Sequence, residues 1–397
     1  MTPREQNLSH SAERRPSACR RSSKNGSPGD CESGYIDCDS ALSAAVVTES
    51  ICGIEPPDEI WRTCARARLA ALTKPLGSLG RLEDLAAQLV AIRREHLVLP
   101  LNAAVYVFAA DHGIAAEGVS AYPQAVTHQM VLNFLAGGAA VNVLARLHDL
   151  TLHVVDVGVN ADFNHIEGLL HHKVSNGTKN MLRDAAMTDD ELSRALLVGA
   201  QLANEAADAG RTLLAVGEMG IGNTTSASAI TCAITGAAES LVTGRGTGLD
   251  DAAHARKIAI VEAIVKKHFA NCTSPHPLEI MRCVGGLEIA AMVGMILAAA
   301  RNRIAIVADG FISTAAAALA VSLEPKVGGY LIVGHRSEEP GHRLLLDYLK
   351  LTPILNLDMR LGEGSGAVLA MSVIQSAIGL YSQMATFTSA GISEASL

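Results

Sequence analysis

Short runs of apolar residues recur along the chain at intervals that fit a parallel β-sheet. The runs are rich in β-branched side chains, which pack well in buried strands. They cover residues 104–110, 152–157, 212–216, 304–308 and 330–333. The stretches between them are long enough for the crossover helices that parallel neighbours require. The pattern therefore predicts an α/β fold with a Rossmann-like parallel sheet and helices on both faces.

Two helices are predicted before the first strand. One begins at Asp58, which is a suitable N-cap, and the second runs from about 79 to 96 after the break at Pro75 and Gly77. Residues 1–52 are rich in Ser, Arg, Gly and Asp and contain few large apolar side chains. Burial cannot offset the entropy cost of ordering such a segment. We therefore expect a disordered N-terminal extension.

The extension also bears on localisation. Its start is rich in Arg and Ser, as in organellar transit segments, but the acidic residues that follow argue against that interpretation. We expect a cytoplasmic protein, with targeting to an organelle through the extension as the alternative.

Composition narrows the classes of function. The chain has 397 residues, of which 49% are hydrophobic, and a formal net charge of −8 that offers no basic field for nucleic acid. The longest apolar stretch, near 289–300, is shorter than the roughly 20 residues that span a bilayer, so we expect no membrane segment. The eight cysteines include no CxxC pair, which argues against a zinc cluster or a disulfide framework.

Polar or glycine residues follow each of the five predicted strands. The exits begin at Asp111, Asp156, Gly217, Asp309 and Gly334. In open α/β sheets, ligands bind beyond the carboxyl ends of the strands. A single exit of this kind can be ordinary turn chemistry, but five together favour a site at this edge of the sheet.

The segment 217–229, GEMGIGNTTSASA, has glycines and then hydroxyl residues where a helix should follow a strand. Backbone N–H groups around Gly220 and Gly222 can surround a phosphate there, and the helix dipole favours its charge. Asn223 stands where a P-loop has lysine, and the third glycine of the dinucleotide fingerprint is missing. A monophosphate site, with Thr224 as a donor, is favoured over a glycine-rich turn with Ser/Thr caps.

Two further glycine-containing segments, 243–251 and 334–342, offer donors suited to a phosphate and to ribose hydroxyls. Each is a weak signal alone. Lys257 follows the first of them and is a candidate point charge for the phosphate. The alternative for Lys257 is a solvated helix face.

Glu363 lies between Gly362 and Gly364, just before an apolar helix. A carboxylate on such a tight turn can approach a ligand closely, as a general base must. The alternative is a carboxylate that only stabilises the start of the helix. The histidines lack the i, i+4 spacing of a helical ligand pair, so we expect no catalytic metal.

The order of the motifs resembles one family. The matching segments include FAADHGIAAEGVSAYPQAVTHQM, GEMGIGNTTSAS and RLGEGSGA. In chain order they cover 73–83, 108–130, 177–181, 217–228, 243–251, 284–292, 308–317, 334–342 and 360–367. Over roughly residues 55–397 the chain is similar to the nicotinate-nucleotide:dimethylbenzimidazole phosphoribosyltransferase family.

The resemblance implies a large α/β domain, a small helical domain formed by both chain ends, and a homodimer. Applied to this chain, it implies a helical segment at 53–100, the α/β catalytic domain at 101–370 and a closing segment at 371–397 that completes the small domain. The extension at 1–52 stands outside this arrangement.

The resemblance also implies a reaction that uses no cofactor. The 5-phosphoribosyl group moves with inversion from nicotinate mononucleotide to 5,6-dimethylbenzimidazole or a related base, and α-ribazole 5′-phosphate forms. Glu363 is similar to the general base of the family, and Glu218 to a second carboxylate. The residues expected to bind substrate are Gly220, Gly222, Asn223, Thr224, Lys257, Asp309, Ser337 and Gly362, with Ser120, Tyr122 and Gln129 beside the base.

Two other classes of function compete with this hypothesis. A nucleotide-dependent oxidoreductase is disfavoured by the incomplete dinucleotide fingerprint. A non-catalytic binding protein for a sugar phosphate or of the corrinoid pathway is disfavoured by the presence of both Glu218 and Glu363.

Overall fold

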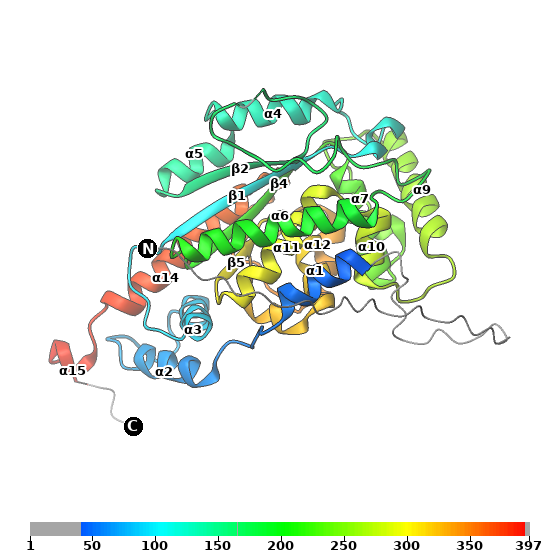
Figure 1. Ribbon diagram of the computed structural model, residues 1–397. Coiled ribbons are helices and arrows are strands. Elements are labelled where there is room, and N and C mark those ends of the chain that lie inside the picture. The colour runs from blue at the N-terminus through cyan, green and yellow to red at the C-terminus, as the bar shows by residue number, and fades with distance from the viewer. Residues whose placement is uncertain (1–40, 165, 394–397) are drawn as a thin grey trace, which may run out of the picture. The chain divides into compact units, whose positions relative to one another are not determined.

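The computed structural model describes residues 41–164 and 166–393. In this part of the chain, six parallel strands form one sheet in the order β3-β2-β1-β4-β5-β6 (Figure 1). They are β1 (Ala103–Ala110), β2 (Thr151–Gly158), β3 (Leu169–His171), β4 (Leu213–Met219), β5 (Ala305–Ala308) and β6 (Leu331–Val333). Because β1 pairs with both β2 and β4, the winding reverses between them, where such sheets bind ligands.

Helices cover both faces of the sheet. Helices α11 and α12 contact one face, with α6 packed on α11, while α4, α5 and α14 contact the other (Figure 1). The helices up to β4 are α1 (Ala41–Ile51), α2 (Glu59–Ala70), α3 (Arg81–Arg93), η2 (Gly113–Glu117), α4 (Ala125–Leu135), α5 (Ala140–Leu147) and α6 (Asp189–Asp208). The others are α7 (Asn223–Thr235), α8 (Glu239–Val242), α9 (Asp251–Phe269), α10 (Pro277–Val284), α11 (Leu287–Arg301), α12 (Phe311–Leu323), η3 (Pro325–Tyr330), α13 (Pro340–Leu349), α14 (Ser365–Gln383) and α15 (Phe387–Ala390).

The core follows from the composition of these elements. Every residue of β1 is buried, and so are the residues 287–300 of α11, which have apolar or small side chains apart from Glu288. A strand that is covered on both faces needs such a continuous apolar run. The predicted parallel sheet with helices on both faces is therefore confirmed.

Residues from both chain ends pack together beside the sheet. Arg68 of α2 donates from Nε to the carbonyl of Tyr381 at 2.8 Å, and Leu72 forms a bridge with Thr386. Helix α3 packs on α14. The predicted boundary between residues 370 and 371 falls inside α14, and the described residues belong to one compact unit. The helical ends therefore share an element with the α/β part, and the domain boundaries stay predictions.

The predicted disorder of residues 1–52 is wrong for 41–51, which form α1, while residues 1–40 lie outside the described residues. Ser43 and Val47 of α1 are buried against α6 and α11. The carboxylate of Asp189, at the start of α6, accepts hydrogen bonds from the Leu42 N–H and the Ser43 hydroxyl. A few small apolar contacts and one helix-terminal carboxylate thus order a segment that lacks a strong hydrophobic pattern.

The sequence pattern also missed one strand. Strand β3 has only three residues and pairs with β2 at the edge of the sheet. A run this short carries no periodicity, so only its pairing partner reveals it.

Two stretches of the described chain are long and apolar enough to cross a membrane, by length and composition alone: Ala125–Leu147 and Ser365–Gln383. The second is α14, whose inner face packs in the core. The first is not one helix, because Gly137 and Gly138 separate α4 from α5. These stretches are weak evidence for a membrane, and the expectation of no membrane partner stays a prediction.

We predict that Val47→Ala lowers the free energy of unfolding by about 1–2 kcal/mol, because it removes two buried methyl groups from the contact of α1 with α6 and α11. Chemical denaturation measures the change. Leu42→Ala is the matched control, since Leu42 lies on the same helix and is 57% exposed. Equal effects of the two variants would contradict the packing of α1 described above.

Candidate active site

A cavity of about 590 Å³ lies beyond the carboxyl ends of β4, β5 and β6. Seven of the residues predicted from the sequence line this cavity: Tyr122, Glu218, Asn223, Thr224, Asp309, Ser337 and Gly362. The other lining residues are Gly246, Thr247, Gly310, Phe311, Ile312, His335, Glu339, Asp358, Met359, Arg360 and Leu361. Strand exits that are far apart in the chain therefore meet at one edge of the sheet, as parallel topology requires.

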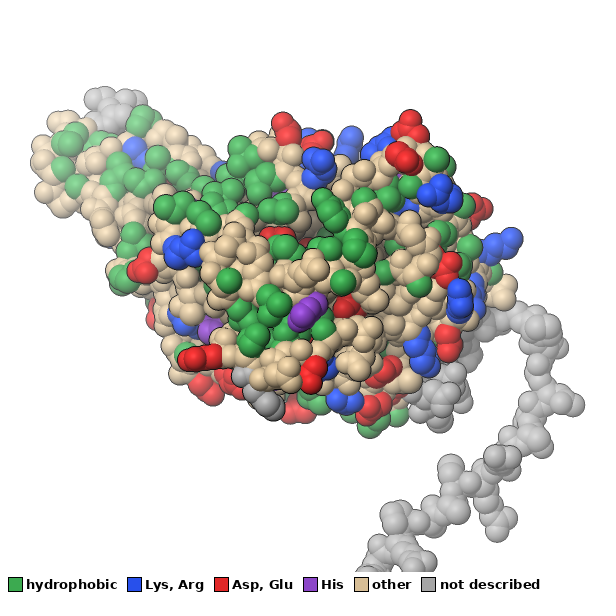
Figure 2. Space-filling view, turned by 90° about the horizontal axis from the view of Figure 1, so that it is seen from above, with side chains coloured by type: hydrophobic (Ala, Val, Ile, Leu, Met, Phe, Trp, Pro, Cys, Tyr) green, Lys and Arg blue, Asp and Glu red, His purple; other side chains and the backbone are tan. Residues whose placement is uncertain are grey.

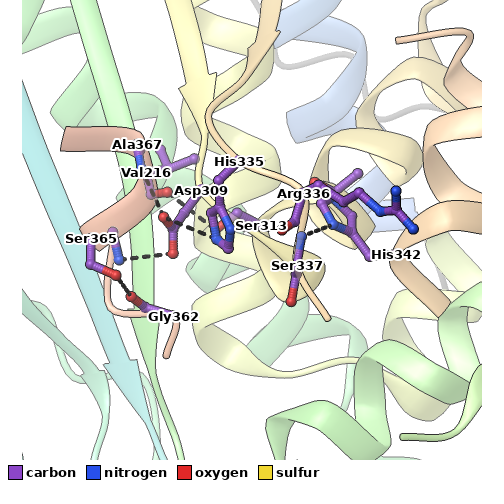
Figure 3. A network of polar contacts seen from close by, with 12 residues as sticks. Val216, Asp309, Ser313, His335, Arg336, Ser337, His342, Gly362, Ser365 and Ala367 are labelled. Atoms are coloured by element: carbon purple, nitrogen blue, oxygen red, sulfur yellow. Dashed lines mark hydrogen bonds and ion pairs between the residues drawn. The ribbon is translucent and has the colours of Figure 1, made fainter. Parts of the chain in front are cut away.

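Asp309 follows β5, and its carboxylate holds the start of α14 (Figure 3). Its Oδ2 accepts the N–H of Gly364 at 3.1 Å, and its Oδ1 accepts the N–H of Ala367 at 2.8 Å. Nε2 of His335 lies 3.9 Å from Oδ1. Burial raises the pKa of Asp309, while His335 and the backbone N–H groups favour the ionised form. Asp309 thus fixes α14 against the end of β5.

Glu363 lies in the turn that precedes α14. Its φ is 64°, between 81° at Gly362 and 84° at Gly364, so three successive residues are left-handed. A Cβ atom added to Gly217 of β4 would lie 2.5 Å from the Cα of Gly364, so the turn packs directly on the strand. Burial and the nearby Asp309 raise the pKa of Glu363 to about 7. Glu363 itself does not line the cavity, but its neighbour Gly362 does.

Glu218 comes from β4 and is 6% exposed at the cavity. The side-chain amide of Asn223 donates a hydrogen bond to its Oε2. Burial raises the pKa of Glu218 to about 8, and the carboxylates of Asp309 and Glu288 add to the shift. Glu288 is itself fully buried and lies 2.6 Å from Nε2 of His112. Without a cation nearby, Glu218 therefore carries a proton at neutral pH.

Lys257, from α9, reaches the N-terminus of α7. Its side chain is fully buried, and Nζ donates to Oγ1 of Thr224 at 2.8 Å. A Cβ atom on Gly246 would lie 3.1 Å from that Nζ and 3.0 Å from Oγ1 of Thr224. Burial lowers the pKa of Lys257 to about 8, and the charge of Glu339 opposes that shift. Lys257 itself does not line the cavity, but Thr224 and Gly246, which lie next to its Nζ, do. An ammonium, a hydroxyl and the N-terminus of α7 thus lie together beside the cavity, an arrangement that suits an anion.

Two of the predicted glycines do not reach the cavity. A side chain on Gly220 would overlap the carbonyl oxygen of Ala110, so this glycine allows β4 and β1 to end close together. Gly222 is the N-cap of α7, with φ of 103°. Both shape the start of α7, and their direct contact with a phosphate stays a prediction.

The residues predicted to border the base do not all reach the cavity. Tyr122 lines the cavity and is 55% exposed. Oγ of Ser120 lies 3.0 Å from Oγ1 of Thr247, which joins this segment to the loop that carries Gly246. Gln129 is exposed on α4 and does not line the cavity. Sequence order alone could not separate these three, because they lie in one polar stretch.

Ser337 is positioned by a buried histidine (Figure 3). The N–H of Ser337 donates to Nδ1 of His342 at 2.9 Å, and Nε2 of His342 lies 3.0 Å from Oγ1 of Thr314. Nδ1 is therefore the acceptor, and Nε2 carries the proton of a neutral ring. Burial lowers the pKa of His342 to about 3, which agrees with that tautomer.

The sequence analysis missed several lining residues that matter chemically. His335 and Glu339 lie in the segment 334–342, whose sequence indicates hydrogen-bond donors but does not single out these two side chains. Arg360 and Met359 precede the Glu363 turn. The guanidinium of Arg360 has no ion-pair partner among the described residues. Residues 41–164 and 166–393 contain no group of three or more His, Cys, Asp or Glu side chains that could hold a metal ion.

Comparison with known proteins gives a consistent family. A family model described as phosphoribosyltransferase matches residues 54–392. A protein of Chloroflexus aggregans named nicotinate-nucleotide–dimethylbenzimidazole phosphoribosyltransferase is 50% identical over 353 residues, which are 88% of this chain and 99% of that protein. A protein of the same name from Geobacter sulfurreducens is 47% identical over 350 residues, which are 88% of this chain and 99% of that protein.

A solved structure agrees with the sequence comparisons. The crystal structure of CobT from Thermus thermophilus has a TM-score of 0.80 and 45% identity, and the match covers 85% of this chain and all of that one. The cavity and its carboxylates therefore lie in a fold shared along nearly the whole length of these relatives. The chain belongs to the nicotinate-nucleotide–dimethylbenzimidazole phosphoribosyltransferase family.

Proposed function

We propose that this protein transfers the 5-phosphoribosyl group from nicotinate mononucleotide to 5,6-dimethylbenzimidazole or a related base in the nucleotide-loop assembly of cobalamin. The products are α-ribazole 5′-phosphate and nicotinate. One observation carries the proposal: Glu218 and Thr224 line the same cavity, the buried ammonium of Lys257 contacts Thr224, and Glu363 follows the lining residue Gly362. A phosphorylated sugar with a positively charged anomeric centre needs this combination.

The leaving group requires little help. Nicotinate is joined to C1′ through its ring nitrogen and is cationic until the bond breaks, so its departure leaves positive charge on the sugar. Glu218 lies in the cavity with its pKa raised to about 8 by burial. Positive charge beside a buried carboxyl favours its ionised form. Glu218 therefore loses its proton when the cationic substrate binds, and it then stabilises the charge that develops on the sugar.

The attacking base must lose a proton. The benzimidazole nitrogen forms the new bond to C1′ with inversion as the bond to nicotinate breaks, and the azole N–H is left on the product unless it is removed. Glu363 is the proposed acceptor of that proton. Its pKa of about 7 lets it exist as a carboxylate near neutral pH and still be a useful base.

Gly220 and Gly222 are proposed to act on the phosphate indirectly, by shaping the N-terminus of α7, with Asn223 and Thr224 as the residues that face the ligand. Tyr122 and Ser337 remain candidates for substrate contact. Gln129 is exposed on α4 and contributes from this chain only if the substrate or another subunit extends to it.

A homodimer is also proposed. Val143 and Leu147 of α5 are 44% and 72% exposed, and Figure 2 shows hydrophobic side chains gathered on the face over α4 and α5. Exposed apolar patches of this kind commonly lie at subunit interfaces. Cofactors, nucleic acid and membranes have no part in this proposal.

The direct test of the function is incubation of the purified protein with nicotinate mononucleotide and a panel of azole bases, with the products identified by mass. We expect a ribosyl phosphate of 5,6-dimethylbenzimidazole and free nicotinate in equal amounts. Binding of the nucleotide without turnover of any base would favour the non-catalytic sugar-phosphate protein. Oxidation of a bound substrate by a nicotinamide cofactor would favour the oxidoreductase.

We predict that Glu363→Gln lowers turnover by roughly 10²–10⁴-fold, the usual contribution of a positioned general base, because an amide cannot accept the azole proton. Binding of the benzimidazole, measured by calorimetry, should persist. Near wild-type turnover by a folded variant would remove Glu363 from this role and favour Glu218.

The pH dependence of kcat/KM provides an independent check. A base with a pKa of about 7 is inactive when protonated, so activity should rise as the pH increases through about 7. Activity should fall again above about 8, where Lys257 loses its charge. Glu363→Gln should remove the contribution of Glu363 to the acidic limb, while the contribution of Glu218, whose pKa is about 8, and the alkaline limb remain.

We predict that the protein in solution has twice the 41.4 kDa mass of the chain. Leu147→Glu should shift it toward the monomer, because a charge on a buried apolar interface is costly. Light scattering coupled to size-exclusion chromatography measures both masses. A wild-type monomer at micromolar concentration would reject the dimer without affecting the proposed reaction.

A further inference from the structure

The charge on the buried ammonium of Lys257 is not offset by its contact with Thr224. Lys257 is fully buried, and a hydroxyl cannot neutralise its charge. A buried charge is costly unless an opposite charge lies nearby. Among the described residues, the charged group that acts on Lys257 is Glu339.

Glu339 is not an ordinary helix-terminal carboxylate. It is the N-cap residue of α13, but its side chain makes no capping hydrogen bond. The side chain is instead directed away from α13, where it lines the cavity and is 7% exposed. The carboxylate of Glu339 therefore interacts with another segment of the chain.

The partner of Glu339 is the loop between α8 and α9. Oε1 accepts the N–H of Gly246 at 2.9 Å, and Oε2 is buried without a hydrogen-bond partner. A side chain on Gly244 would overlap Oε2, so the loop backbone lies directly against the carboxylate. The same Gly246 lies next to Nζ of Lys257 and Oγ1 of Thr224. One loop backbone thus separates the carboxylate from the ammonium.

The remaining charged groups around this loop have other partners. Arg245 pairs with Asp251 at 2.5 Å on the exposed side of the loop. His254 of α9 lies 2.8 Å from the carbonyl oxygen of Thr243. Glu339 is therefore the group that both holds the loop and faces the buried ammonium.

We propose that Glu339 is a positioning residue for the phosphate: it holds the 244–246 loop against Lys257 and supplies the negative charge that offsets the buried ammonium, so that Lys257 and Thr224 stay in place for a phosphorylated ribose. This inference rests on the proposed function for the identity of the anion. Glu339 acts through Lys257 and the loop, and the chemistry at C1′ does not involve it.

The charge of Glu339 and its hydrogen bond can be separated by substitution. Glu339→Gln keeps an oxygen that can accept from Gly246 but removes the negative charge. Glu338→Gln is the matched control, because Glu338 is the preceding residue, is exposed and does not line the cavity. Thermal unfolding of both variants tests whether each is folded.

The experiment measures KM for nicotinate mononucleotide and for the benzimidazole at several pH values. Glu339→Gln should raise the KM for the nucleotide about fivefold at pH 8. If the pKa of Lys257 falls from about 8 to about 7 when the neighbouring charge is lost, the protonated fraction at pH 8 falls from about one half to about one tenth. The alkaline limb should move to lower pH, because Glu339 favours the protonated lysine. KM for the benzimidazole and the values for Glu338→Gln should stay within twofold of wild type.

Binding of ribose 5-phosphate, measured by calorimetry with wild type and both variants, does not depend on turnover. Weaker binding to Glu339→Gln alone would support the role of Glu339 even if the transfer reaction were absent. Unchanged binding and an unchanged alkaline limb would overturn it. Equal losses for the nucleotide and the benzimidazole would also overturn it, as they would indicate a structural defect of the whole cavity.

If Glu339→Gln does not fold, Glu339→Asp provides the test, because it keeps the charge on a shorter side chain. This variant should keep the alkaline limb of wild type. A shifted limb would contradict the proposal.

Discussion

The site depends on one buried carboxylate. Asp309, at the end of β5, accepts backbone hydrogen bonds from Gly364 and Ala367, and thereby attaches the start of α14 to the sheet. Such charge-assisted bonds are stronger than neutral ones, and the helix dipole adds to them. The turn that carries Glu363 is held between this contact and the backbone of Gly217. Asp309 thereby supports the left-handed conformation at three successive residues, together with the hydrogen bond from the Ser365 hydroxyl to the carbonyl of Gly362.

The same interaction shapes the electrostatics of the cavity. Burial raises the pKa of Asp309 while backbone N–H groups and His335 oppose that change, and a negative charge on Asp309 adds to the effect of burial in raising the pKa of both Glu218 and Glu363. The two carboxyls therefore titrate near neutral pH, where a proton acceptor and a charge stabiliser are useful. Behind Thr224, burial lowers the pKa of Lys257 and Glu339 opposes that change. The carboxyls and the ammonium thus depend on the same balance of desolvation and neighbouring charge.

Packing of small residues makes these close approaches possible. The strand exits are rich in glycine, and a Cβ atom on Gly362 would lie 2.5 Å from Oε1 of Glu218. Gly220 and Gly244 likewise lie against backbone or carboxylate oxygens that a side chain would displace. Several glycines in the motifs therefore allow neighbouring segments of the chain to lie close together.

The sequence by itself determined the parallel sheet, the edge of the sheet at which the site lies and the motifs by which the chain resembles its family. It could do so because periodicity and the residues that follow each strand are local properties. It also pointed to Glu218, Asp309 and Lys257 through their types and positions. Only the tertiary structure decided that α1 is ordered, that Gln129 lies away from the cavity, and that Glu339 faces Lys257. Those facts depend on contacts between segments far apart in the chain, and burial and neighbouring charge exist only once those segments are packed together.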